Sequence, residues 1–384
     1  MPINANGKLR VKGVGQIGPI LTDFISVWDT NLGDGQPTIT LPLVSTGNYN
    51  FSVNWGDGTT DTITTYDQAE VTHTYATGGV YTITITGTIE GWQFGGVGEC
   101  AKITSITNIG PLKLGNEGAY FQGCSNLTTI GGVFDLTGTT NFTSMFQECT
   151  SLTSINGIGS WNTSAVTNMG GMFASATVFN QDISGWDVSS VTGMNGMFID
   201  ATSFNQPLNL WNTAAVTNMY VMFANATSFN QDISGWDVSS VTDMTSMFDS
   251  TPFNQPLNSW NVSAVTDMGG MFNDATVFNQ SLNSWNVSAV IDMVNMFKGA
   301  TSFNQDISGW DVSNVVNLEN FMGGKSTADY SYYDNLLNTW SLLTLQNGVT
   351  WDMGSIEYTS AGATARQDII DNYSWTITDG GLAA

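Results

Sequence analysis

Aspartates at a fixed spacing are the residues of this sequence best suited to do chemistry. Asp243, Asp267 and Asp292 occupy the same position in three consecutive copies of a repeated segment. Carboxylate oxygens stacked in this way are hard ligands of the kind that Ca²⁺ prefers, so the three residues are candidate metal ligands. The alternative needs no metal: each carboxylate would lie in the first turn of a short helical segment, where the helix dipole stabilises it. We prefer the alternative, and Ca²⁺ is the one cofactor that the sequence admits.

A second acidic stretch contains Asp29, Asn31 and Asp34, followed by Gly35. It has the spacing of part of a calcium-binding EF loop but lacks the closing glutamate. Here too the interpretation without a metal is preferred.

Other reactive residue types argue against an enzyme. His73 is the single histidine, and it lies in an alternating, strand-like segment, so we expect a packed side chain. Cys100, Cys124 and Cys149 share one repeat position, where later copies carry alanine, which predicts buried structural thiols, with a disulfide between neighbouring coils or a metal site as the alternative. The sequence contains no GxSxG, HExxH, CxxC or P-loop pattern. No catalytic residue is predicted.

The overall charge restricts the partners. The formal net charge is −24 although only 10% of the residues are charged, which argues against binding to nucleic acid or to an anionic membrane. A hydrophobic content of 41% is enough for a core, unlike that of a disordered acidic chain. No apolar run approaches the roughly 20 residues that span a bilayer, and residues 1–20 lack the apolar region of a secretory signal. We therefore expect no membrane insertion and no export by the general route.

A repeat of about 25 residues organises most of the chain. It is marked by phenylalanine followed by Asn-Gln, and by a tryptophan seven residues later. Three earlier units lack the Asn-Gln pair but keep the small residue that precedes each unit. Such a period is typical of a solenoid, in which each unit buries its apolar face against its neighbours. We count about nine coils, beginning at Ile103, Leu127, Leu152, Phe179, Phe204, Phe229, Phe253, Phe278 and Phe303.

Within one coil the apolar spacing predicts two kinds of structure. From Phe179 to Val188 the segment is too short for a helix and fits a strand. From Val191 to Ala201 apolar residues recur every three or four positions, which predicts a short helix or a 3₁₀ turn, and the coil is thus leucine-rich-repeat-like. The Asn-Gln pairs predict a stacked amide ladder that satisfies backbone groups, with a ligand-binding amide row as the alternative. Aspartates beside the tryptophans skip a coil, as at Asp187 and Asp237, which keeps like charges apart.

The fold class is therefore mixed and mostly β, with four parts. Residues 1–23 form a basic N-terminal arm in which Lys8, Arg10 and Lys12 are candidate docking residues, with a solvated tail as the alternative. Residues 24–92 alternate with period two and predict a small β-sandwich. Residues 93–322 are the solenoid. Residues 323–384 lose the repeat and predict a small α/β cap, with helices near 332–343 and 364–373 and strands near 349–359 and 374–381.

Two parts of the chain resemble known families. The segment FSVNWGDGTT with VTHTYATGGVYTITITG resembles a polycystic-kidney-disease (PKD) domain, an immunoglobulin-like module that implies spacing or adhesion. Its matching residues are Trp55, Gly56, Asp57, Gly58, His73, Tyr75, Gly79 and Tyr81. The pattern FNQDISGWDVSSVTDMTSMF over residues 100–320 resembles the BspA-like bacterial surface leucine-rich repeats. That resemblance implies a non-enzymatic surface protein that binds host or neighbouring molecules.

These observations lead to a functional expectation. We expect a structural and host-recognition protein on the surface of a bacteriophage virion, as a tail fibre, spike or capsid decoration. Its arm would dock on other virion proteins and its solenoid would bind a host glycan or protein, with homo-oligomers left open. The alternative is a secreted bacterial cell-surface adhesin. Tyr220 is the candidate partner contact, because its equivalents are Gly170, Asn195, Thr245, Gly269 and Val294.

Overall fold

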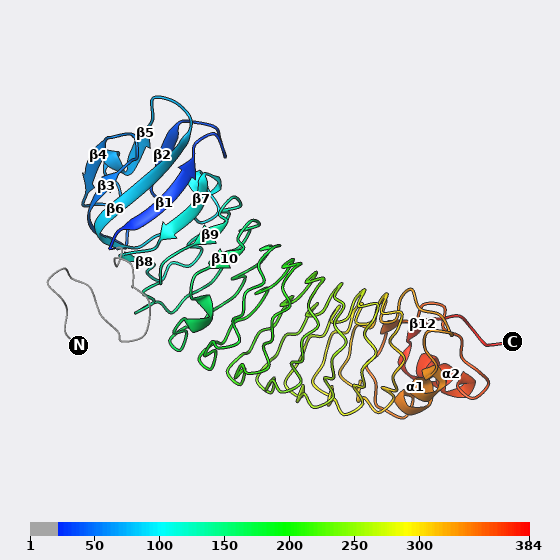
Figure 1. Cartoon of the computed structure of the whole chain (residues 1–384). Coiled ribbons are helices and arrows are strands. Elements are labelled where there is room, and N and C mark those ends of the chain that lie inside the picture. Colours follow the sequence, from blue (N-terminus) through cyan, green and yellow to red (C-terminus); the bar gives the residue numbers. More distant parts are fainter. Residues whose placement is uncertain (1–21) are drawn as a thin grey trace, which may run out of the picture.

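The computed structural model describes residues 22–384, which form an elongated rod with β-strands at one end and two helices at the other (Figure 1). Lys8, Arg10 and Lys12 of the predicted docking arm lie outside the described residues. The α-helices of the described part are α1 (Tyr333–Trp340) and α2 (Ala363–Tyr373). The predicted class, mostly β with few helices, is confirmed.

The N-terminal end of the rod contains a mixed sheet of eight strands. Strands such as β1 (Phe24–Asp29) alternate buried and less buried residues, which is the period expected when one face covers a core. A second sheet pairs β2 (Thr38–Thr40) with β5 (Thr72–Thr74). The strands of the large sheet run in the order β10 (Ser154–Ile155), β9 (Thr129–Ile130), β7 (Ile103–Asn108), β1 (Phe24–Asp29), β6 (Val80–Glu90), β3 (Asn48–Asn54) and β4 (Thr60–Ile63), with β8 (Leu112–Lys113) beside β6. Three short 3₁₀ helices are η1 (Ala69–Val71), η2 (Gly98–Ala101) and η3 (Ile158–Ser160).

The large sheet continues across the predicted boundary at Trp92. Strand β1 pairs antiparallel with β7, which in turn pairs parallel with β9, and β9 pairs parallel with β10. The first coils are therefore joined to the N-terminal strands by backbone hydrogen bonds rather than by a linker alone.

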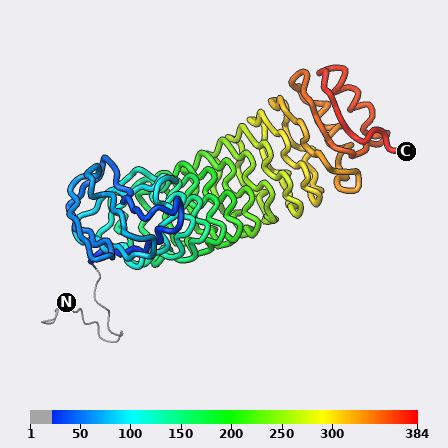
Figure 2. Tube along the Cα trace, turned by 90° about the horizontal axis from the view of Figure 1, so that it is seen from above, coloured from blue at the N-terminus to red at the C-terminus, as the bar shows by residue number. Residues whose placement is uncertain are grey.

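Beyond β10 the chain makes successive turns that lie side by side along the rod (Figure 2). Parallel bridges join neighbouring turns from Asn141↔Asn168 to Asp292↔Asn317. The bulky residues point inward as the period predicts: Trp211 is 3% exposed and Phe229 is fully buried. Equivalent rings stack, with centroids 6.4 Å apart for Trp186 and Trp211.

The short helix predicted from Val191 to Ala201 is wrong, and the alternative of a 3₁₀ turn is met only by separate single turns, as where the Met197 N–H donates to the Met194 carbonyl at 3.2 Å. In this segment the N–H groups of Met194, Gly196, Phe198 and Asp200 donate to carbonyls of the next coil. Gly196 and Asp200 adopt left-handed conformations, both with φ of 58°. Consecutive tight turns closed by left-handed residues also place apolar side chains every three or four positions, so they imitate the helical period.

The predicted strand from Phe179 to Val188 is also wrong, whereas the amide ladder is confirmed. The described residues 179–188 contain no strand, although β7, β9 and β10 occupy the corresponding position in the first three coils. From Ile155 onward, side-chain amide oxygens accept the backbone N–H groups that pair with backbone carbonyls in the strands of the first coils. The N–H of Ile155 donates to Gln181 Oε1 at 2.6 Å, and the N–H of Asn205 donates to Asn180 Oδ1 at 3.0 Å. The amides thus satisfy backbone groups between coils.

The C-terminal residues cover the last coil. Trp351 in β11 (Thr350–Asp352) forms a parallel bridge with Leu318, and β11 pairs parallel with β12 (Thr376–Thr378). Trp340 of α1 is fully buried. Both helices and both strands of this part lie where the sequence predicts them.

Candidate binding face

One surface of the coils carries a continuous ladder of polar residues, which we call the ladder face. It consists of the bridged residues and, in each coil, the residue two positions further on; the residue between them is buried in the core. Most ladder side chains accept a hydrogen bond from the N–H two residues further on, as Asn168 Oδ1 does from Gly170 at 2.8 Å and Asn218 Oδ1 from Tyr220 at 2.9 Å. These Asx turns fix the backbone of the face. The bridged residues are Asn141, Asn168, Gly193, Asn218, Asp243, Asp267, Asp292 and Asn317.

The three candidate calcium ligands lie on this face, one in each of three adjacent coils. Oδ1 of each of Asp243, Asp267 and Asp292 accepts a backbone N–H at 2.8–2.9 Å. Asp292 Oδ2 also accepts a hydrogen bond from Asn317 at 3.1 Å. Across residues 22–384, no three His, Cys, Asp or Glu side chains gather as a metal-binding group. The structure therefore does not bring these aspartates together as a calcium site, and their Asx turns account for the carboxylates.

Tyr220 lies on the ladder face and is 45% exposed. It closes one end of a groove of about 340 Å³ that crosses four coils. Gly170 forms part of the groove floor, where a Cβ atom would lie 2.9 Å from Asn195 Oδ1. Asn168 and Asn195 line the groove with amides. A tyrosine ring beside amide groups suits a polar, uncharged partner.

A second hollow of about 190 Å³ begins one coil beyond Tyr220. Gly269 takes the same repeat position as Gly170 and again leaves room. Asn273 Oδ1 and Asn295 Oδ1 are buried there without a hydrogen-bond partner among the described residues. Tyr220 therefore stands between two hollows. Tyr220 was predicted from the sequence but the two hollows were not, although glycine at two of the equivalent repeat positions, Gly170 and Gly269, was the available signal.

The reactive residue types lie away from this face. Cys124 and Cys149 are fully buried, and burial raises the pKa of the Cys124 thiol well above its ordinary value. Cys100, Cys124 and Cys149 are all buried and free, as predicted. Burial keeps such thiols protonated and unreactive.

His73 is a packed residue of β5, as expected. Its ring stacks on Trp55 with centroids 4.8 Å apart and meets Tyr75 edge-on at 4.5 Å. Its Nε2 shares a 2.9 Å hydrogen bond with Asp57 Oδ2. A hydrogen bond from the Thr59 hydroxyl, assisted by the Thr59 N–H and by His73, lowers the pKa of Asp57 to about 2. This pair joins β5 to the turn between β3 and β4.

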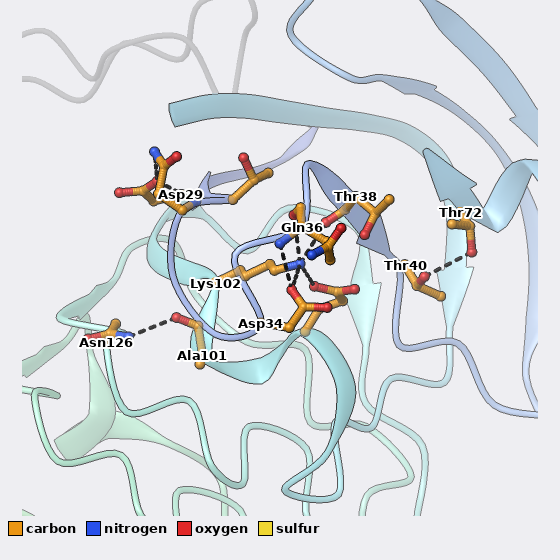
Figure 3. A network of polar contacts seen from close by, with 12 residues as sticks. Asp29, Asp34, Gln36, Thr38, Thr40, Thr72, Ala101, Lys102 and Asn126 are labelled. Atoms are coloured by element: carbon orange, nitrogen blue, oxygen red, sulfur yellow. Dashed lines mark hydrogen bonds and ion pairs between the residues drawn. The ribbon is translucent and has the colours of Figure 1, made fainter. Parts of the chain in front are cut away.

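The second acidic stretch does not converge on one point: Asp34 pairs with Lys102 (Figure 3), whereas Asp29 Oδ1 accepts hydrogen bonds from the Asn31 N–H and Nδ2 at 3.0 and 2.8 Å. Lys102 Nζ lies 2.7 Å from Asp34 Oδ1 and 2.6 Å from Glu99 Oε2. It also donates to the carbonyls of Gln36 and Thr38 at 3.1 and 3.0 Å. The Lys102 side chain is 1% exposed, so this ammonium occupies the oxygen cage and joins the N-terminal strands to the first coil. Its hydrogen bonds with the two carboxylates raise the pKa of Lys102 despite its burial.

The stacked turns and their shared surface define a repeat protein. The family described as "Mycoplasma protein of unknown function, DUF285" matches residues 140–252 and again residues 227–335. The two matches together span about half of the chain, and the chain belongs to this family. They do not reach residues 24–92, so the PKD resemblance stays a prediction. No curated protein matches the sequence. Between residues 22 and 384, no helix is long and apolar enough to cross a membrane.

Proposed function

We propose that this protein is a non-enzymatic recognition protein that binds a surface glycan or protein through the ladder face around Tyr220. The observation that carries the proposal is the exposed Tyr220 ring between two amide-lined hollows. Elsewhere in the described coils the aromatic rings belong to the stacked core. An exposed tyrosine provides a large contact area with few rotatable bonds, which is why it is frequent in binding surfaces.

The proposal includes a finer description of the fold. Residues 93–322 act as a leucine-rich-repeat-like solenoid of about nine coils, of the BspA-like kind, and residues 24–92 act as a PKD-like spacer. The family match over residues 140–335 and the parallel bridges between coils support the first part. The packing of Trp55, His73 and Tyr75, which the PKD pattern contains, supports the second.

We keep two proposals for the surface that displays the protein. The first is a bacteriophage virion, with residues 1–23 docking on other virion proteins and the coils facing the host. The second is a bacterial cell surface, and the match to a family named for Mycoplasma favours it. Mass spectrometry of purified particles and immunogold labelling of intact cells distinguish them, because each proposal requires the protein in only one of the two preparations.

Binding of the full chain to intact cells of the candidate host tests the recognition role. We expect Tyr220→Ala to weaken binding at least about tenfold, which corresponds to 1.4 kcal/mol, and Tyr220→Phe to retain most of it. Tyr66→Ala is the matched control, because Tyr66 is similarly exposed, at 43%, but lies in the sandwich. Equal binding by the wild type and Tyr220→Ala would rule out the ladder face as the binding surface.

A further inference from the structure

A pocket with an apolar rim opens on the second and third coils. It has a volume of about 670 Å³ and lies between residues 133–138 and residues 157–165. Phe134, Leu136 and Trp161 line it, and Val133 at its rim is 70% exposed. Apolar surface beside a hollow is typical of a place that another segment of protein covers.

The described chain begins close to this pocket. The carbonyl of Asp23 accepts a hydrogen bond from Asn108 Nδ2 at 2.6 Å. Gly132 of the next coil approaches Asn108 so closely that a Cβ atom on this glycine would lie 2.7 Å from Asn108 Oδ1. Val133 follows Gly132 directly. Asp23 is therefore about two strand spacings, roughly 10 Å, from the rim of the pocket.

The sequence before Thr22 suits an apolar pocket at this distance. Residues 14–21, which lie outside the described residues, read VGQIGPIL and carry no charge. An extended chain advances about 3.3 Å per residue, so the stretch from Ile17 to Leu21 is long enough to cross roughly 10 Å. Ile17, Ile20 and Leu21 are the large apolar side chains within that reach.

Charge favours the arm of the same chain over a second copy as the occupant. Residues 1–21 carry three of the eight basic residues, and all 32 acidic residues follow them. Asp135 is the one charged side chain among the described residues that line the pocket. A basic arm is thus attracted to this surface, whereas the acidic body of a second copy is repelled. A short tether also gives an effective concentration on the order of millimolar, so a weak contact is enough.

We propose that residues 17–21 of the same chain occupy this pocket, with Ile17 and Ile20 packed over Val133 and Leu136. The pocket is then an intramolecular docking site for the N-terminal arm. This inference goes beyond the proposed function, because neither Tyr220 nor the displaying surface enters it. The pocket and the groove at Tyr220 share no lining residue.

Cysteine cross-linking of the full chain tests the position of the arm. The double variant Ile17→Cys with Val133→Cys should form an intrachain disulfide under mild oxidation, because a disulfide requires Cα atoms within about 7 Å. The native cysteines are buried and do not compete. The control pairs Ile17→Cys with Leu210→Cys, since Leu210 is 73% exposed but lies three coils further along. We expect the control to cross-link at least about tenfold more slowly.

Hydrogen exchange gives a second readout that needs no new cysteine. Ile17→Ser combined with Ile20→Ser should make the backbone amides of residues 133–138 exchange at least about threefold faster than in the wild type. Ile3→Ser is the matched control and should leave these rates unchanged, because Ile3 lies outside residues 17–21.

Three outcomes would overturn the proposal. Cross-linking at equal rates with Val133→Cys and with Leu210→Cys would mean that the arm has no preferred position. A disulfide found only between two chains would assign the pocket to the arm of a second copy. Equal exchange at residues 133–138 in the wild type and the double serine variant would show that these isoleucines do not cover the pocket.

Discussion

Lys325 Nζ lies 2.6 Å from the carbonyl oxygen of Ala300, the residue that takes the equivalent position one coil earlier. Lys325 is 1% exposed and also donates to the carbonyl of Phe303 at 2.8 Å. Where the regular coils place a small alanine, the final unit places a long cation that covers carbonyls of the coil before it. The lysine therefore helps to end the stack.

Burial of Lys325 predicts that stability rises at alkaline pH. Desolvation lowers the pKa of Lys325 from 10.5 to about 8. Between these two values the unfolded chain binds a proton that the folded chain has lost, so the free energy of unfolding increases as pH rises from about 8 to 10.5. Urea unfolding should show a rise of up to about 3 kcal/mol in the wild type relative to Lys325→Met. Lys298→Met, at an exposed position one coil earlier, should behave like the wild type, and an unchanged pH dependence in Lys325→Met contradicts the prediction.

The cage around Lys102 predicts a strongly destabilising variant. Lys102→Met should lower the free energy of unfolding by about 3 kcal/mol, because it leaves the mostly buried Glu99 carboxylate without its cation. The double variant Lys102→Met with Glu99→Gln should recover part of this loss. Lys113→Met is the matched control, since its 3.2 Å pair with Glu90 is exposed and should be worth less than about 1 kcal/mol. Similar losses of stability for Lys102→Met and Lys113→Met in urea unfolding would mean that the buried ion pairs of Lys102 do not stabilise the fold more than an exposed pair does.

The amide ladder predicts a cost for removing a single asparagine. Asn205 Oδ1 accepts hydrogen bonds from the Asn230 N–H and from Gln231 Nε2, both at 3.0 Å. Asn205→Ala removes the acceptor of the Asn230 N–H, while Gln231 Nε2 keeps the Asn205 carbonyl at 3.1 Å, so the variant should cost about 0.5–1.5 kcal/mol in urea unfolding. Asn209→Ala, at an exposed position of the same coil, should change stability by less than about 0.5 kcal/mol. If the two variants are equally stable, water takes the place of Asn205 Oδ1 in the amide ladder without a cost in stability.

Three adjacent aspartates on the ladder face predict a stabilising substitution. Asp267 is bridged to Asp243 on one side and to Asp292 on the other, so like charges lie in neighbouring coils. Asp267→Asn removes the central charge but keeps an oxygen for the Gly269 N–H, and should raise the free energy of unfolding by about 0.5 kcal/mol at low salt. The gain should disappear in molar salt, where such charges are screened.

Asp182→Asn is the control for this prediction. Asp182 makes the same kind of Asx turn, with the Ser184 N–H at 2.9 Å, but the next coil carries Pro207 at its position. Thermal unfolding at two salt concentrations should show no stabilisation for this variant. A gain for Asp267→Asn that persists in high salt would mean that charge repulsion is not its cause.

Sequence periodicity predicted which side chains are buried but not the conformation of the coil. Trp211 and Phe229 are in the core because an apolar residue that returns every 25 positions has only its neighbours to pack against. The segment containing Gly196 and Asp200 was predicted as a short helix or a 3₁₀ turn. Apolar spacing of three and four residues fits both a helix and a run of turns with left-handed residues, and only the hydrogen bonds to the next coil distinguish them.

The sequence alone determined the length of the repeat, the inward side of each coil, the amide ladder and the composition of the cap, because these depend on residue types at regular spacing. Tertiary structure decided the rest. Lys102 meets Gln36 across 66 residues, and Tyr220 stands beside a hollow that exists because Gly170 lies two coils away. Contacts of this kind depend on the register in which distant segments pack, and no local pattern encodes that register.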